Sequence, residues 1–212
     1  MDTDVEAPPA GTRIPVLLRT MRVVLHVSVA VLLLIGLTRS LAPALRDGDH
    51  GSAWLTGLLA ALFAAIYLAG TVVEKRRAEE ADWEAPDGGI VVRGRATWLV
   101  LVTVAWWGLL AVHVDFAWLV FPLFFLHLHV VGRRSMPGAL VLVLLLTVSV
   151  LVGFLAHRGT LDVGSVVGPV LGAVVAVVMS AAYALFLEEA RIQRRTSEDL
   201  RAAQDRLASS ER

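Results

Sequence analysis

The sequence predicts an all-α, multi-pass membrane protein: a bundle of six transmembrane helices followed by a cytoplasmic coiled-coil helix. Its composition is the first observation behind this fold class. Hydrophobic residues make up 57% of the 212 residues, charged residues only 18%, and the mean hydropathy is +0.70. Soluble domains carry about 25% charged residues. The net charge of zero gives no reason to expect a nucleic-acid partner, and the absence of cysteine excludes disulfides and thiolate metal sites.

Six apolar stretches are the second observation. A helix needs about 20 mostly apolar residues to cross about 30 Å of hydrocarbon. The third and fourth stretches are short and are joined only by residues 113–115, so they are expected to form a tight helical hairpin. The expected spans are Val23 to Leu41, Ala53 to Val73, Ala96 to Val112, Phe116 to Val131, Ala139 to Ala156 and Val166 to Leu187.

The third observation is the placement of positive charge, which sets the orientation of membrane helices. If the N-terminus is cytoplasmic, sixteen of the nineteen Lys and Arg residues fall in cytoplasmic segments. Only Arg39, Arg46 and Arg158 do not. We therefore expect both termini in the cytoplasm and membrane lipid as the surroundings of the bundle.

Three regions follow from these patterns. Residues 1–22 are expected to be a disordered or interfacial cytoplasmic tail, since they begin acidic and Pro-rich. Residues 23–187 form the six-helix transmembrane domain. Residues 188–212 form a cytoplasmic coiled-coil linker. Neither Pro nor Gly occurs between Gly172 and Arg212, so the sixth helix is expected to enter the cytoplasm without a break.

Small residues recur at every fourth position of the sixth span. Residues four apart share a helix face, and small residues there let two helix backbones approach closely in lipid. The stripe packs either within one subunit or against its copy in a parallel homodimer. It consists of Gly164, Gly168, Gly172, Ala176, Ser180 and Ala184.

The linker carries a weak coiled-coil pattern. Apolar or small residues there follow the three- and four-residue steps of the a and d positions. Two successive steps of four meet at Thr196, a stutter that locally unwinds a supercoil. The positions concerned are Ile192, Thr196, Leu200, Ala203 and Leu207.

This linker, LEEARIQRRTSEDLRAAQDRLASSER, resembles the one in bacterial sensor histidine kinases of the NarL/DesK type. The resemblance implies a bacterial cell-membrane protein that acts as the sensory input module of a two-component system. In that family a multi-pass membrane region runs into such a helix. A dimerisation and phosphoacceptor region follows, and then an ATP-binding domain.

The chain departs from the family in its catalytic parts. The family's phosphoacceptor is a His followed by an acidic residue, and none of the six histidines here has that neighbour. The Asn-rich and Gly-rich ATP-binding boxes are missing too. We therefore expect no catalytic residue and no cofactor in this chain. ATP, Mg²⁺ and a response regulator would act only through a kinase core that these residues do not contain.

Ionisable residues within the spans are candidate sensing groups, because they are costly in hydrocarbon. His26, His127 and His129 are expected at similar depth near the cytoplasmic side. His127 and His129 should point about 160° apart, given the helical period. Each histidine either hydrogen-bonds a neighbouring helix or belongs to a proton-sensing, haem or metal site. A haem- or metal-binding membrane protein is therefore the alternative function.

On the outer side, His113 and Asp115 cap the tight hairpin, near Trp106, Trp107 and Trp118. Together with Asp162 these residues could form a small external pocket. Tryptophans at the membrane interface also occur without any such role. A small transporter is the third reading, but the spans lack acidic residues and show no repeat between halves, a common feature of transporters.

Overall fold

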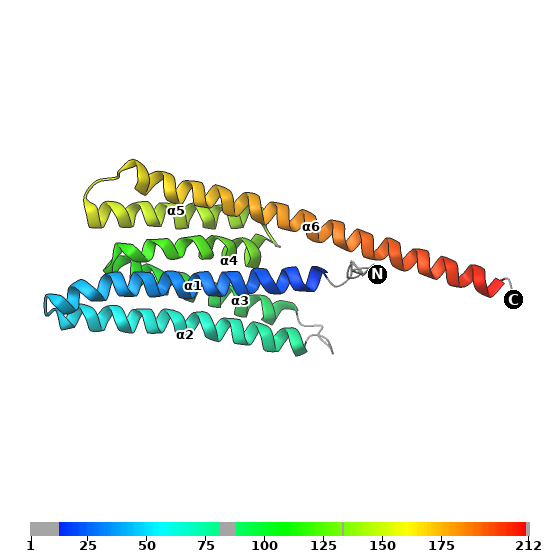
Figure 1. Cartoon of the computed structure of the whole chain (residues 1–212), viewed down its shortest axis with the longest axis horizontal. Helices are drawn as coiled ribbons and strands as arrows, with labels where there is room; N and C mark the ends of the chain where they lie inside the picture. Colours follow the sequence, from blue (N-terminus) through cyan, green and yellow to red (C-terminus); the bar gives the residue numbers. More distant parts are fainter. Residues whose placement is uncertain (1–12, 81–87, 133, 211–212) are drawn as a thin grey trace, which may run out of the picture. The chain divides into compact units, whose positions relative to one another are not determined.

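The structure is a computed structural model that describes residues 13–80, 88–132 and 134–210. These residues form helices joined by short turns (Figure 1). The helices are α1 (Arg13–Arg46), α2 (His50–Glu80), α3 (Gly88–Val112), the 3₁₀ segment η2 (Val114–Leu119), α4 (Val120–Gly132), α5 (Met136–Arg158) and α6 (Val163–Ser210).

Within the described part of the chain, six helices are long and apolar enough to cross a membrane, with η2 and α4 together making the fourth. The chain is therefore an all-α, multi-pass membrane protein. A helix suits this environment because it satisfies its backbone hydrogen bonds internally, where no water is present to do so.

The chain divides into two compact units. Leu25–Val177 forms the larger unit, which contains most of the residues of the six spans. The second unit combines the start of α1, up to Val24, with the part of α6 from Val178 onward.

Within the bundle, the fourth span is the most enclosed. More than half of it (56%) is buried, against 17% of the first span. Its central side chains Leu123 and Phe124 are fully buried. The closest helix pairs are α4 with α5 and α2 with α3, so the core is built around α4 with α3 and α5.

Short turns connect the helices at one end of the bundle, which we call the short-turn end (Figure 1). These turns are residues 47–49, 113 and 159–162. Gly48 and Gly159 both have a φ of 72°, the left-handed conformation that glycine adopts at helix C-termini. Asp49 and Asp162 accept hydrogen bonds from the N–H groups of residues three further on, at 3.0 and 2.7 Å. These caps make compact antiparallel turns possible.

Several helices extend beyond the apolar stretches that the sequence marks as spans. α1 begins at Arg13, so residues 13–22 are helical and only residues 1–12 of the expected tail lie outside the described part. Pro15 does not prevent this start, because proline is tolerated in the first turn of a helix. α2 extends to Glu80 and α3 begins at Gly88, so both reach into residues 74–95, which lie between the expected second and third spans. The fourth span begins as a 3₁₀ segment, not as an α-helix.

Candidate functional site

The first candidate site is at the short-turn end, where α1 packs against η2. Gly36 makes this close approach possible. A Cβ atom at Gly36 would lie only 2.7 Å from Cδ1 of Phe116, far inside the optimal carbon–carbon separation of about 3.5–4.0 Å. The side chain of Phe116 is fully buried. Arg39 follows Gly36 by three residues, so it lies on the same face of α1.

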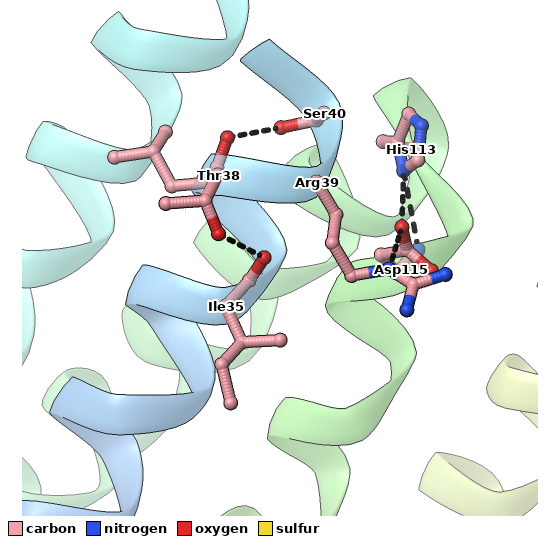
Figure 2. A network of polar contacts seen from close by, with 7 residues as sticks. Ile35, Thr38, Arg39, Ser40, His113 and Asp115 are labelled. Atoms are coloured by element: carbon pink, nitrogen blue, oxygen red, sulfur yellow. Dashed lines mark hydrogen bonds and ion pairs between the residues drawn. The ribbon is translucent and has the colours of Figure 1, made fainter. Parts of the chain in front are cut away.

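Arg39 and Asp115 form an ion pair across this contact (Figure 2). Nε of Arg39 donates to Oδ2 of Asp115 at 2.9 Å. Nδ1 of His113 lies 3.6 Å from the same oxygen and accepts a hydrogen bond from the Asp115 backbone N–H at 3.3 Å. In its neutral form His113 therefore carries its proton on Nε2. The site joins one cation, one carboxylate and one titratable ring.

The two charged partners differ in exposure. The Asp115 side chain is 11% exposed and the Arg39 side chain 67%. A carboxylate buried to this degree is costly without its partner. Dissolved ions that reach the exposed guanidinium screen its attraction to the carboxylate, so the strength of the ion pair can respond to ionic strength at this end of the protein.

Trp106 on α3 anchors η2 through a hydrogen bond. Its indole Nε1 donates to the backbone carbonyl of Phe116 at 3.0 Å, and its side chain is fully buried. Nearby hydroxyl groups are also satisfied, since Thr38 and Ser40 donate to the carbonyls of Ile35 and Leu37 (Figure 2). The ion pair thus joins helix α1 to the hydrogen-bonded segment η2.

Sequence reasoning found His113 and Asp115 but missed Arg39. It treated Arg39 only as an exception to the charge asymmetry. The available signal was an arginine inside an apolar span, which by itself indicates a buried or functional partner.

The other residues of the expected external pocket lie apart from this network. Trp107 donates to Oγ of Ser149 at 3.2 Å. Trp118 stacks on Phe121. Asp162 caps α6, where hydrogen bonding to the side chain and then the backbone N–H of Ser165 lowers the pKa of its carboxyl below the ordinary value. Asp162 and Asp115 therefore have different partners.

The intramembrane histidines occupy different environments. Nδ1 of His26 lies 2.8 Å from the hydroxyl of Tyr67, which links α1 to α2. His127 is buried, with Nδ1 2.8 Å from the Leu123 carbonyl and Nε2 3.1 Å from Oγ1 of Thr103. His129 is exposed. The opposite exposure of His127 and His129 confirms that they point to different faces of α4.

These contacts give little support to a shared metal or haem site. His26 pairs with α2, whereas His127 pairs with α3 and its own helix. Across residues 13–80, 88–132 and 134–210, no group of three His, Cys, Asp or Glu side chains is arranged to hold a metal ion.

The small-residue stripe of α6 divides between two environments. A Cβ atom on Gly172 would overlap the ring of Phe121 on α4, and Ala176 is fully buried within the chain. Gly164 and Ala184 are exposed, whereas Gly168 and Ser180 are half-buried. At Gly172 and Ala176, the stripe therefore serves packing within one subunit.

The linker positions that the structure describes are exposed. Ile192 and Leu200 are 51% and 59% exposed, and Thr196 and Ala203 are also on the surface. The hydroxyls of Thr196 and Ser197 donate to the carbonyls four residues before them, at 3.0 and 2.9 Å. The Leu207 side chain lies outside the described part.

Comparison of the chain with protein-family models, with curated proteins and with solved structures gave no match. Functional inference therefore depends on the geometry and the linker pattern.

Proposed function

We propose that this chain is the membrane-embedded sensory input module of a two-component histidine kinase. In this proposal, a stimulus acts on the bundle and α6 transmits it to a kinase core outside these 212 residues. The observation that carries the proposal is the single helix α6. It runs from Val163 to Ser210 over 48 residues, roughly 72 Å at 1.5 Å per residue.

A helix of this kind suits transmission because it joins two chemically different halves. Its first half is apolar and crosses the membrane. Its second half is rich in charged residues and carries the a/d pattern that resembles the kinase linker. A continuous helix passes on a rotation or a shift that a flexible loop would absorb.

The exposed apolar side chains of the linker favour a parallel homodimer. Ile192 and Leu200 are both more than half exposed, with exposed fractions of 51% and 59%. Burying such side chains against a second copy is favourable, by about 1.5–3 kcal/mol for each one fully buried. Since Gly172 and Ala176 already pack within the subunit, we propose that the dimer contact lies in the linker.

The stutter at Thr196 is the proposed switch point. Hydroxyl groups that back-bond to the preceding turn, as those of Thr196 and Ser197 do, weaken and often bend a helix. A helix pair with two nearly equal packings needs only a few kcal/mol of bias to change between them.

The Arg39–Asp115 pair is the proposed stimulus-sensitive contact. The charge asymmetry of the chain predicts that the short-turn end faces away from the cytoplasm. The exposed guanidinium would then meet the outside medium, and changes in the pair would alter how α1 packs on η2. The N-in, C-in orientation is part of this proposal.

Cysteine cross-linking in native membranes tests the dimer. Single cysteines at Leu200 and Ala203 should cross-link between copies, because both occupy a/d positions. A cysteine at the exposed residue Arg201, which falls outside the a/d seam, is the matched control and should cross-link much less. If all three sites are accessible to a thiol reagent but Leu200 and Ala203 do not cross-link, the proposal is wrong.

The same assay tests the link to the outer site. Asp115→Asn keeps the side-chain shape but removes the charge that pairs with Arg39. If the ion pair takes part in signalling, Asp115→Asn should change the ratio of cross-linking at Leu200 to cross-linking at Ala203. An unchanged ratio, in protein with unchanged stability, would remove the ion pair from the signalling mechanism.

A further inference from the structure

The ring of His113 and the guanidinium of Arg39 approach the same oxygen of Asp115 at the short-turn end (Figure 2). Nε of Arg39 donates to Oδ2 at 2.9 Å, and Nδ1 of His113 lies 3.6 Å from that oxygen. Nδ1 also accepts the backbone N–H of Asp115 at 3.3 Å. The carboxylate therefore has a cation on α1 and, two residues before it in the chain, a titratable ring.

The neutral ring of His113 cannot bind this carboxylate. While Nδ1 accepts the Asp115 N–H it carries no hydrogen, so two acceptors, Nδ1 and Oδ2, face each other. Among the ion pairs of the described residues, Arg39 then supplies the only permanent cation to Asp115. In this state the carboxylate belongs to Arg39 and ties η2 to α1.

One proton on Nδ1 reverses the role of the ring. An imidazolium donates from both nitrogens, so Nδ1 can no longer accept the Asp115 N–H and instead faces an anionic oxygen. A small rotation of the ring closes the 3.6 Å separation to a hydrogen-bond distance of about 2.7–3.2 Å. Arg39 and protonated His113 then repel each other at one carboxylate.

The connection along the chain favours His113 in this competition. His113 is only two residues from Asp115, so little chain entropy is lost when the two side chains pair. Arg39 comes from another helix, and its side chain is 67% exposed, so it can turn away into the medium. Protonation therefore weakens the hold of Arg39 on Asp115.

The other charged and titratable groups of the short-turn end have different surroundings. Nδ1 of His157 lies 3.0 Å from a carbonyl of its own helix, the guanidinium of Arg158 lies 4.8 Å from the ring centre of Phe154, and Asp162 caps α6. His50 is exposed at the start of α2, and α3 ends in apolar residues. No ion pair within the described part of the chain joins His113 or Asp115 to Arg46, Asp47, Asp49, His50, His157, Arg158 or Asp162.

We propose that His113 is a proton-binding switch: its protonation moves the Asp115 carboxylate from Arg39 to His113 and releases the polar tie between α1 and η2. Imidazole is the side chain whose charge ordinarily changes between about pH 5 and pH 8. The switch is a property of the bundle and needs neither the linker nor a kinase core. That acidification at the short-turn end is the stimulus is a further step, and this step rests on the proposed sensory function.

The stability cost of removing Arg39 at two pH values tests the switch. Arg39→Gln takes the cation away from Asp115 and should raise the unfolding equilibrium constant at pH 8 by up to about five-fold, the upper end for an ion pair with an exposed partner. At pH 5.5 the increase should fall below about two-fold, because protonated His113 then supplies a cation to Asp115. Reversible SDS unfolding of the full chain in mixed micelles, relative to the parent at the same pH, gives both values.

Two histidine variants separate the switch from a general effect of pH. His113→Gln keeps an oxygen that can accept the Asp115 N–H but cannot take up a proton, so the cost of Arg39→Gln should become equal at both pH values. His157→Gln is the matched control, because His157 lies at the same end with other partners, and it should leave the pH difference unchanged. Side-chain nitrogen NMR, with the His113 signal assigned by its loss in His113→Gln, should show Nδ1 bare at pH 8 and protonated at pH 5.5.

Three results would overturn the switch: an equal cost of Arg39→Gln at both pH values in the parent, a pH difference that persists in His113→Gln, or a neutral His113 at pH 5.5. The cross-linking assay at Leu200 and Ala203 tests the stimulus separately. If the switch is confirmed but the ratio of cross-linking at these two sites is the same at pH 8 and pH 5.5, protons are not the stimulus. A failure of cross-linking at both pH values would instead count against the proposed sensory function and leave the switch in place.

Discussion

Replacing Gly36 with Ala should destabilise the bundle at the contact between α1 and η2. The added Cβ would lie 2.7 and 2.8 Å from Cδ1 and Cε1 of Phe116. The ring cannot easily move, because Phe116 is fully buried and its carbonyl accepts the hydrogen bond from Trp106. Overpacking of this kind costs about 1–3 kcal/mol.

Helix propensity opposes this cost. Alanine is about 1 kcal/mol more favourable than glycine within a helix. The net expectation for Gly36→Ala is therefore a loss of about 0–2 kcal/mol in the free energy of unfolding. Gly57→Ala on α2 is the matched control, since a Cβ there would meet nothing within 4 Å. That variant should be neutral or slightly stabilising.

Reversible unfolding by SDS in mixed micelles, followed by circular dichroism, measures both variants. The double variant Gly36→Ala/Phe116→Leu isolates the contact, because a smaller side chain removes the ring atoms that the Cβ would meet. The combined loss should be smaller than the sum of the single losses by more than 0.5 kcal/mol, as is usual for residues in contact. Equal stability of the Gly36 and Gly57 variants would refute the close packing of α1 on η2.

Three further predictions concern other contacts. Trp106→Phe should cost about 0.5–1.5 kcal/mol of unfolding free energy, because it removes the hydrogen bond that the buried indole donates to the Phe116 carbonyl, and Trp107→Phe should cost less, since Trp107 is 46% exposed. The same SDS titration compares them. The lowered pKa of Asp162 means that its cap on α6 is fully present above the ordinary aspartate pKa and is lost as the pH falls through the lowered value. Hydrogen exchange at the Ser165 amide should therefore lose protection in strong acid, relative to an Asp162→Asn variant that keeps the cap. Reporter fusions after Arg46, Arg77, Arg134 and Arg212 should read outside, inside, inside and inside, and an outside signal at Arg212 would contradict the six-span, N-in topology.

The sequence by itself determined the number of spans and the unbroken course of the sixth helix. Both are local properties, since a helix in lipid satisfies its backbone within its own segment and apolar length decides whether it can span. The helical period also placed His127 and His129 on different faces. The predicted helix ends were less accurate: residues 13–22, 74–80 and 88–95 are helical although they lie outside the six apolar stretches.

Only the tertiary structure decided which faces meet. Arg39 and Asp115 are 76 residues apart, and nothing in the local sequence pairs them. The sequence of the small-residue stripe on α6 fits packing within a subunit and packing between copies equally well. The structure decides for Gly172, because the ring of Phe121 from the same chain occupies the space beside it. Likewise, the hydrogen bond between Thr103 and His127 exists only because α3 and α4 pack together. Such contacts depend on the complementary shapes of distant segments, and a pattern along one segment carries no information about the surface it will meet.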